Sequence, residues 1–440
     1  MKYVFKVILL FLIVFNFRLP VLHYSCTAAV IIALFYYLFV KRSNPLTYFF
    51  HRYNFIILIS TLVIAFITYF IKTESGSKEV GYYARFLVQG WMLACLLFVL
   101  PILIDKKETA FNEAIAVICG AFALQGLIHT LGFLITPFGE FILSFSGAEL
   151  GDIGGEEASR SFRFYALTGS TFFDLPAAYG VACIMFFRLQ LDPNQNYLRG
   201  WKAFVVIVLM LLGITLAGRT GFIGFALGLA LYLFYNWSHF STIWRNAVKI
   251  AGGYLLLLAV FYTVIPAQKQ AYFIDNVIPF AFEAYYNWKE TGRFATGSSD
   301  ALEVFPLRPE TLMWGDGKTS GESTYHYTDT GYMNDLIYGG IFYLLALSLY
   351  QLLFFGTPMR MANMENDSKN GRINLFFFFL LFVHFFILEY KGKAIGFIHT
   401  AEVIVLYYGM AYLVEQYALE DAEEEEETSS EEMLNESAVV

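Results

Sequence analysis

A polar segment that is suited to acid–base chemistry runs directly into an apolar helix at residues 326–345, HYTDTGYMNDLIYGGIFYLL. His326, Asp329 and Asp335 lie along it, and it ends a long hydrophilic stretch between apolar runs. A carboxylate or an imidazole at such a boundary can take a proton from a hydroxyl group, as a general base does. We predict Asp329 as the base and His326 as the reserve candidate.

Two other interpretations of this segment stay open. His326 and Asp329 have a spacing that two metal ligands could use, but two ligands make a weak metal site, and we predict none. Asp329 also suits the N-cap of a helix that starts near residue 330, where its carboxylate would accept backbone N–H bonds. A cap and a catalytic role do not exclude each other.

Arg219 stands in a tight turn between two apolar runs, in the sequence LAGRTGFIGFALG. Gly218, Gly221 and Gly224 permit close backbone approach around its guanidinium group. A planar guanidinium can hold a phosphate through two parallel hydrogen bonds, which predicts a phosphate-binding role. The alternative is an arginine that extends to the membrane interface or bonds to carbonyl groups at a helix end.

Arg160 and Arg163 lie just before another apolar run, at 168–189. Two arginines beside a membrane helix can bind an anionic lipid head group, or they can pair with the acidic residues of the Gly-rich stretch before them. Asp174 and Pro176 fall inside this predicted span, so we expect a broken or locally unwound helix there. The alternative for Asp174 is a bond to a freed backbone amide.

The hydrophilic stretch at 267–327 holds a third arginine, Arg293, and several aromatic residues. Its GDGKTSG sequence suggests a nucleotide loop, but a phosphate loop needs Gly six residues before the Lys, and residue 312 is Leu. We therefore predict no nucleotide cofactor. Aromatic side chains that could stack on sugar rings are Tyr285, Trp288, Trp314 and Tyr332.

The composition places the chain in a membrane. Hydrophobic residues make up 58% of it and charged residues 15%, with 47 Phe and 30 Tyr, more apolar surface than a soluble protein can bury. Runs of about 20 apolar residues, the length that spans a bilayer, predict an all-α integral membrane protein with about twelve transmembrane helices. They lie near 3–17, 21–40, 54–71, 86–104, 110–136, 168–189, 201–217, 220–236, 248–266, 328–355, 373–389 and 394–415.

The distribution of Lys and Arg predicts the orientation. They are more frequent in the segments that face the cytoplasm if both termini lie there. Long loops at about 137–167 and 267–327 then face outward, the second between helices 9 and 10. Residues 1–415 would form one membrane domain, and the acidic residues 416–440 predict a disordered cytoplasmic tail.

Together these segments resemble the O-antigen polymerase and ligase superfamily of bacterial envelope glycosyltransferases. That family combines about a dozen spans, a large outer loop late in the chain, and arginines at two earlier outer helix ends. Arg163, Gly169 and Pro176 are similar to its first motif, in which Arg, Gly, small residues and Pro open a span. AGRTGFIGF, with Arg219, is similar to the second motif.

The third motif of the family has His or Asp, then a small polar residue, about nine further residues and a Gly. Asp329, Thr330 and Gly340 fit this spacing. GR at 292–293 and WGDG at 314–317 are also similar to features of the family's outer loop. Asp followed by Gly-Tyr resembles the polymerases of exopolysaccharide or capsule.

The resemblance implies a polysaccharide polymerase that passes a glycan from undecaprenyl pyrophosphate to another lipid-linked repeat unit, at the outer face of the bacterial cytoplasmic membrane. It implies no metal ion and no other cofactor. The implied partners are the lipid-linked glycan, membrane lipid and, optionally, a chain-length regulator protein, but no nucleic acid. The implied roles are pyrophosphate binding for Arg163, Arg219 and Arg293, proton acceptance for Asp329 or His326, and support for Tyr332 and Asp174.

Two alternatives remain at this point. A ligase would move the glycan to lipid A core or to a protein, but ligases of this family carry His where this chain has Asp329, and His326 comes three residues too early. A transporter or flippase of lipid-linked sugars would show charges at the membrane midplane in broken helices. Asp174 with Pro176 is the feature that favours transport.

Overall fold

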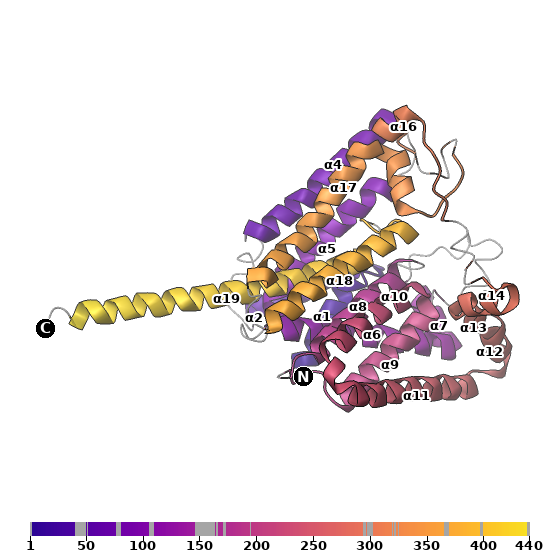
Figure 1. Cartoon of the computed structure of the whole chain (residues 1–440), viewed down its shortest axis with the longest axis horizontal. Coiled ribbons are helices and arrows are strands. Elements are labelled where there is room, and N and C mark those ends of the chain that lie inside the picture. The colour runs from indigo at the N-terminus through magenta and orange to yellow at the C-terminus, as the bar shows by residue number, and fades with distance from the viewer. Residues whose placement is uncertain are drawn as a thin grey trace.

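The computed structural model is a bundle of long helices with a small two-stranded hairpin near the N-terminus (Figure 1). The hairpin pairs β1 (Arg18–Leu19) with β2 (His23–Tyr24) in antiparallel register. The residues that the structure describes are 2–39, 50, 52–75, 81–104, 110–145, 163, 166–169, 173–193, 195–293, 296, 302–318, 320, 323, 325–364, 369–396 and 399–437.

The helices follow one another along the chain in four groups. The first contains α1 (Lys2–Val14), α2 (Ser25–Phe39), α4 (Arg52–Ser75), α5 (Gly81–Leu103), α6 (Ala110–Leu134) and α7 (Thr136–Leu143). The second contains α8 (Asp174–Gln190), α9 (Trp201–Ala217), α10 (Thr220–Tyr235), the 3-10 turn η4 (Trp237–His239) and α11 (Phe240–Val264). Short elements follow: α12 (Ala267–Tyr272), the π-helical turn η5 (Phe273–Val277), α13 (Ile278–Ala281), α14 (Glu283–Thr291) and α16 (Pro309–Trp314). The last group is α17 (Gly331–Met364), α18 (Lys369–Lys391) and α19 (His399–Ser437).

A helix lies in each of the twelve ranges that the apolar runs predict. Among the described residues, six helices contain a stretch long and apolar enough to cross a bilayer. The chain is therefore an all-α, multi-pass membrane protein, and the crossing of the remaining ranges stays a prediction. The six stretches are Tyr53–Ser75, Tyr83–Leu103, Ala110–Leu134, Ala247–Val264, Gly331–Met364 and Lys369–Lys391.

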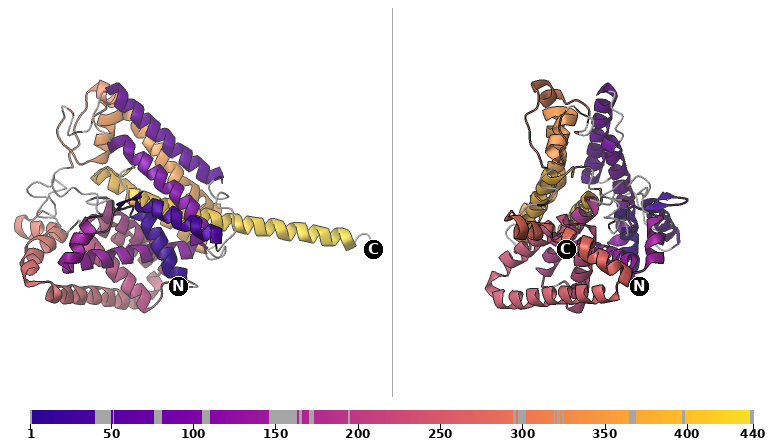
Figure 2. Two further views of the ribbon diagram at one scale, coloured as in Figure 1. Left: turned by 180° about the vertical axis from the view of Figure 1, so that it is seen from behind. Right: turned by 90° about the vertical axis from the view of Figure 1, so that its right-hand side faces the viewer.

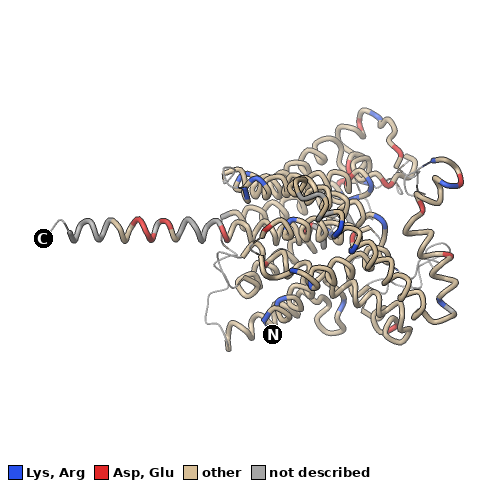
Figure 3. The backbone as a smooth tube through the Cα atoms, turned by 60° about the horizontal axis from the view of Figure 1, so that its bottom comes forward, with Lys and Arg blue, Asp and Glu red and all other residues tan. Residues whose placement is uncertain are grey.

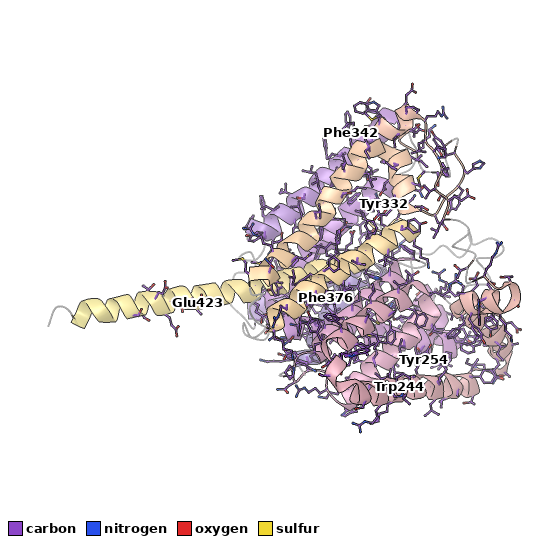
Figure 4. The ribbon with its side chains drawn as sticks, viewed as in Figure 1. Trp244, Tyr254, Tyr332, Phe342, Phe376 and Glu423 are labelled. Carbon is purple, nitrogen blue, oxygen red and sulfur yellow. The ribbon has the colours of Figure 1, made fainter. Side chains whose placement is uncertain are left out.

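The helix α11 shows why a membrane is needed. Only 6% of its most apolar stretch is buried by the rest of the protein. Trp244, Leu255 and Leu256 are each more than 60% exposed on it, and Figure 4 labels Trp244 on this outer helix. A surface of this kind is unstable in water but is the normal surface of a helix that lies against lipid.

Helix α8 lies at the centre of the bundle, and its residues from Leu175 to Leu189 are all buried. It packs closely against α10 through glycines: a Cβ atom on Gly224 would lie 2.3 Å from the Cα atom of Gly180. Nearer the start of both helices, a Cβ on Gly221 would lie 2.9 Å from the carbonyl oxygen of Pro176. Small residues permit this approach of two backbones in a membrane, and the contact brings the first turns of α8 and α10 together.

Helix α17 is broken at Gly340, which has φ +68° and ψ −169°. A break at this position takes the carbonyl groups of the preceding turn out of the helical hydrogen-bond pattern. The loop at 314–317 replaces those bonds: Asp316 N–H donates to the Ile337 carbonyl at 2.6 Å and Gly317 N–H to the Tyr338 carbonyl at 2.8 Å. The WGDG sequence therefore docks the outer loop onto the kink of α17.

Replacing Gly340 with alanine is expected to destabilise the fold by about 2 kcal/mol or more, because a positive φ is strained for alanine. A Cβ atom there would also lie 2.4 Å from the Met313 carbonyl oxygen. Gly356, in the same helix, is the matched control: a Cβ there meets no atom within 4 Å, so Gly356→Ala should be neutral or stabilising by about 0.5–1 kcal/mol. Unfolding of both variants in detergent micelles measures the difference, and equal stabilities would contradict this account of the kink.

The two ends of the bundle differ. The N-terminus and the projecting part of α19 lie toward one end, and α12, α13, α14 and α16 lie at the opposite end (Figure 1), as the view from behind also shows (Figure 2, left). The predicted outer loop at 267–327 is thus folded into short helices in its described part, and it is separated from both termini by the length of the bundle.

The acidic tail differs from the prediction of disorder. Helix α19 continues through it to Ser437 and projects from the bundle, with acidic residues along its length (Figure 3). The first part of α19 is buried in the bundle, so the tail extends a helix that is already nucleated. Its many Glu residues are also good helix formers, which favours continuation at little cost.

Candidate functional site

The close packing of α8 and α10 brings Arg163 and Arg219 together, although they are far apart in sequence. Arg163 is buried, and its Nε donates a hydrogen bond to the carbonyl oxygen of Ala217, two residues before Arg219, at 2.8 Å. Both guanidinium groups lie over the ring of Phe280, with Cζ atoms 5.3 Å (Arg163) and 4.8 Å (Arg219) from its centroid. Two arginines thus share one aromatic platform at the loop end of the bundle.

Glu283, the first residue of α14, supplies a carboxylate to this pair. It forms an ion pair with Arg219 through a hydrogen bond from Nη1 to Oε2. The two side chains are 16% and 27% exposed, so the pair lies at the rim of the site. The guanidinium of Arg219 donates to a carboxylate here, and the same donor geometry suits a phosphate oxygen. Arg219 therefore already holds an anion, the Glu283 carboxylate, and Arg163 lies over the same ring.

Lys391 adds a third cation. It is the last residue of α18, it is partly buried, and its charge interacts with those of Arg219, Arg163 and Glu283. We call Arg163, Arg219 and Lys391 the cationic cluster. Sequence analysis used Lys391 only to predict orientation, because a lysine at a helix end normally marks a membrane boundary.

The start of α17 meets the same end of α18. A Cβ atom on Gly331 would lie 2.4 Å from the carbonyl oxygen of Gly392, and a Cβ on Gly392 would lie 3.2 Å from the ring of Phe173. The segment that follows Asp329 and the residue that precedes α8 therefore both contact the residue after Lys391. Two of the polar segments that sequence analysis separated therefore meet at the end of α18.

Asp329 and His326 lie in the described stretch just before α17. Asp329 Oδ1 accepts a hydrogen bond from the Tyr327 hydroxyl at 2.6 Å, and this bond raises the pKa of Tyr327 to about 12 although most of the side chain is exposed. Tyr327 therefore stays protonated and keeps donating to the carboxylate at neutral pH. His326 is exposed. Among the described residues, neither Asp329 nor His326 makes a hydrogen bond or ion pair with the cationic cluster.

The structure does not use Asp329 as a helix cap. Helix α17 begins at Gly331, and no bond joins the Asp329 carboxylate to a backbone N–H within the described residues. The side chain of Asn334 instead accepts from the Ser320 N–H at 3.2 Å and donates to the carbonyls of Thr328 and Thr330 at 2.8 and 3.0 Å. The Asp329 carboxylate therefore has a different environment from a cap, with the Tyr327 hydroxyl as its donor.

Tyr332 lies at the start of α17, where Figure 4 labels it near the end of α18. Its hydroxyl donates to the carbonyl oxygen of Phe386 at 3.4 Å, and its ring lies 5.5 Å from the ring of Phe386. Tyr332 therefore packs one turn away from Lys391. Its contact with α18 helps to fix the start of α17 against the end of α18.

The position of Asp174 differs from the prediction that it lies inside a span with a broken helix. It is the first residue of α8 and does not lie inside a span, and Pro176 stands in the first turn. Proline is tolerated there because the N–H that it lacks has no helical partner at that position. No break of α8 is needed, and the feature that favoured transport is removed. The acidic stretch before Arg163, including Arg160, lies outside the described residues.

Arg293 does not join the other two arginines. It is exposed, after the left-handed Gly292 that ends α14, and its backbone N–H donates to Thr291 Oγ1 at 3.3 Å. Within the described part of the chain its side chain neither pairs with Glu283 nor lies over the Phe280 ring. Its predicted place in an anion site therefore has no support from the geometry.

A buried ionic cluster lies behind this site, and sequence analysis did not predict it. Arg85 of α5 pairs with Asp335 of α17, with Nη2 and Oδ1 3.6 Å apart and both side chains 1% exposed. The carboxyl group of Glu389, on α18, interacts with both of them. We call Arg85, Asp335 and Glu389 the buried ionic cluster. An arginine directly before an apolar run was the available signal, since a charge beside such a run normally has a partner.

Glu389 links the buried ionic cluster to the site. Its Oε2 accepts hydrogen bonds from the backbone N–H groups of Ala394 at 2.8 Å and Ile395 at 2.7 Å. A Cβ atom on Gly331 would lie 2.3 Å from its Oε1. One buried carboxylate therefore holds the turn after Lys391 and touches the start of α17.

The chain was compared with protein-family models, with curated proteins and with solved structures, and no match was found in any of the three comparisons.

Proposed function

We propose that this protein is a polysaccharide polymerase that transfers a glycan from undecaprenyl pyrophosphate to a sugar hydroxyl of another lipid-linked repeat unit. The observation that carries the proposal is the anion-binding arrangement of Arg163 and Arg219 over Phe280, with the Glu283 carboxylate already held by Arg219. It lies at the end of the bundle where the short helices of the outer loop gather (Figure 1). A lipid-linked diphosphate in the bilayer would approach such a site from the side.

In the proposed reaction the acceptor hydroxyl oxygen attacks the anomeric carbon of the donor sugar. The bond between that carbon and the pyrophosphate oxygen breaks, and its electron pair stays on the undecaprenyl pyrophosphate. Guanidinium groups beside the leaving group stabilise the charge that develops on it in the transition state. Arg163 and Arg219 are assigned to this role, and no metal ion is needed for it.

The proton of the acceptor hydroxyl goes to Asp329 in this mechanism. Support comes from the contact between Gly331 and Gly392, which puts the start of α17 at the end of α18 where Lys391 lies. The Tyr327 hydroxyl, which donates to Asp329, would orient the carboxylate. His326 stays the reserve base, and the exposed Tyr285 and Trp288 on α14 are candidates for stacking on the sugars.

The proposed orientation puts both termini in the cytoplasm and the outer loop outside a bacterial cytoplasmic membrane. It is supported by the position of the termini toward one end of the bundle and of α12–α16 at the other, together with the distribution of Lys and Arg. The donor would then be met after its transfer to the outer leaflet.

The test of this function is polymer formation by the purified protein in lipid, supplied with the undecaprenyl-pyrophosphate repeat unit of its host and with EDTA. A ladder of products on electrophoresis would support the polymerase. Transfer to lipid A core or to a protein without a ladder would replace it with a ligase, and movement of the precursor across the bilayer without bond formation would replace it with a transporter.

Glu283→Gln is expected to strengthen the binding of inorganic pyrophosphate by about tenfold, because the anion then no longer competes with a charged carboxylate for Arg219. Isothermal titration calorimetry of the protein in nanodiscs measures the affinity. Glu290→Gln, at an exposed position of the same helix, is the matched control and should leave the affinity unchanged. Weaker binding in Glu283→Gln would show that Glu283 supports the site instead of occupying it.

A further inference from the structure

Lys391 lies where three segments of the site meet. The residue after it, Gly392, is in contact range of Gly331 at the start of α17 and of Phe173 before α8. The Lys391 charge interacts first with Arg219, then with Arg163 and Glu283. An ammonium group on a partly buried helix end that is repelled by two guanidinium charges is unfavourable unless an anion is present. This arrangement points to a ligand with more negative charge than the Glu283 carboxylate.

Glu389 fixes the turn that follows Lys391. The two hydrogen bonds from Ala394 and Ile395 to the Glu389 carboxylate close the turn that follows Lys391. Glu389 is 1% exposed and belongs to the buried ionic cluster with Arg85 and Asp335. A buried carboxylate is costly unless its environment compensates it. Burial of the Glu389 carboxylate therefore costs free energy, and the group lies at the turn that orients Lys391.

We propose that Lys391 is a third ligand of the diphosphate group, and that it binds the phosphate that Arg219 does not hold, with Glu389 as its positioning residue. This inference rests on the proposed function for the identity of the lipid on the diphosphate, but not for the anion itself. A diphosphate carries charge on two phosphorus centres, and three cations against the single carboxylate of Glu283 match that distribution. The ammonium group of Lys391 is a compact charge, and it can bind the second phosphate without the planar pair of donors that a guanidinium provides.

The experiment measures the binding of inorganic pyrophosphate and inorganic phosphate to the full chain in phosphatidylcholine nanodiscs, where no anionic head group competes. Lys391→Met should weaken pyrophosphate binding by about tenfold or more, the effect of losing one charge-assisted bond. It should change phosphate binding much less, and Lys391→Arg should keep most of the affinity. Lys289→Met, at an exposed position on α14, is the matched control and should bind as the wild type does.

The positioning role of Glu389 is tested by a double-mutant cycle. Glu389→Ala should weaken pyrophosphate binding in the wild-type background but have little further effect in Lys391→Met, because it acts through the lysine. Equal effects in both backgrounds, in protein shown to be folded by thermal unfolding, would overturn the positioning role. Unchanged pyrophosphate binding in Lys391→Met would overturn the third ligand.

Failure of this inference is distinguishable from failure of the proposed function. If the wild-type protein forms a product ladder but its pyrophosphate affinity does not depend on Lys391, the polymerase function stands and Lys391 is not a ligand. If the protein binds pyrophosphate through Lys391 but forms no ladder, the anion site stands and the polymerase function is wrong. Added phosphatidylglycerol that displaces pyrophosphate would reassign the site to an anionic lipid head group and overturn the diphosphate ligand.

Discussion

Arg219→Ala is expected to reduce polymer formation by about two to three orders of magnitude, the usual cost of removing one preorganised donor from a developing oxyanion. The loss should fall on the turnover number more than on the KM for the donor, because the stabilised charge develops in the transition state. The fold should survive, since Arg219 and its partner Glu283 are partly exposed and water can solvate the remaining carboxylate. Initial rates of ladder formation at several donor concentrations measure both parameters.

Two further variants sharpen this prediction. Arg219→Lys keeps the positive charge but loses the planar donor fork, so its rate should lie between those of the wild type and Arg219→Ala. Arg18→Ala removes an arginine that is exposed on β1, and it should leave the rate unchanged. A rate for Arg219→Ala within about threefold of the wild type would remove Arg219 from the catalytic machinery, since such a ratio is less than one hydrogen bond contributes.

Arg85→Met is expected to destabilise the protein by about 3–5 kcal/mol, the cost of leaving a buried partner uncompensated. Arg85 is the cation beside the Asp335 and Glu389 carboxyl groups, all of them buried between α5, α17 and α18. Its removal would leave two buried carboxyl groups without a cation at low dielectric. Unfolding in mixed micelles with increasing denaturing detergent measures the change.

The double variant Arg85→Met with Asp335→Asn should recover a large part of that loss, because the amide keeps the shape of the carboxylate without its charge. Arg18→Met, at the exposed site on β1, serves as the control and should change stability by less than about 0.5 kcal/mol. If the double variant is no more stable than Arg85→Met alone, the buried ionic cluster is not held by charge compensation, and the role of Arg85 is then packing against Phe86.

The helices followed from the sequence because each apolar run must satisfy its own backbone in a bilayer. The helix ends followed less well, since hydropathy averages over many residues and does not show where helical hydrogen bonding begins. Asp174 and Pro176 were placed inside a span for this reason, whereas α8 begins at Asp174. The acidic tail was predicted disordered from its charge alone, although α19 extends through it from a packed start.

The residues of the candidate site were likewise only partly recognisable from the sequence. Arg163 and Arg219 were recognised because charged residues beside apolar runs are rare and need a reason. Lys391 and Arg85 were missed because a cation near a helix end is read first as a marker of orientation. Asp335 was noticed in its polar segment, but its partner Arg85 lies 250 residues earlier, and no local pattern joins the two.

The sequence by itself determined the all-α membrane class, the approximate position of the long apolar helices and the polar segments at their ends, because these depend on local composition and on the thickness of a bilayer. Only the tertiary structure decided which ends meet. Gly180 and Gly224 let α8 and α10 approach, and the break at Gly340 lets the WGDG loop dock on α17. Contacts of this kind depend on the shapes of surfaces far apart in the chain, and the first of them brings Arg163 and Arg219 over one aromatic ring.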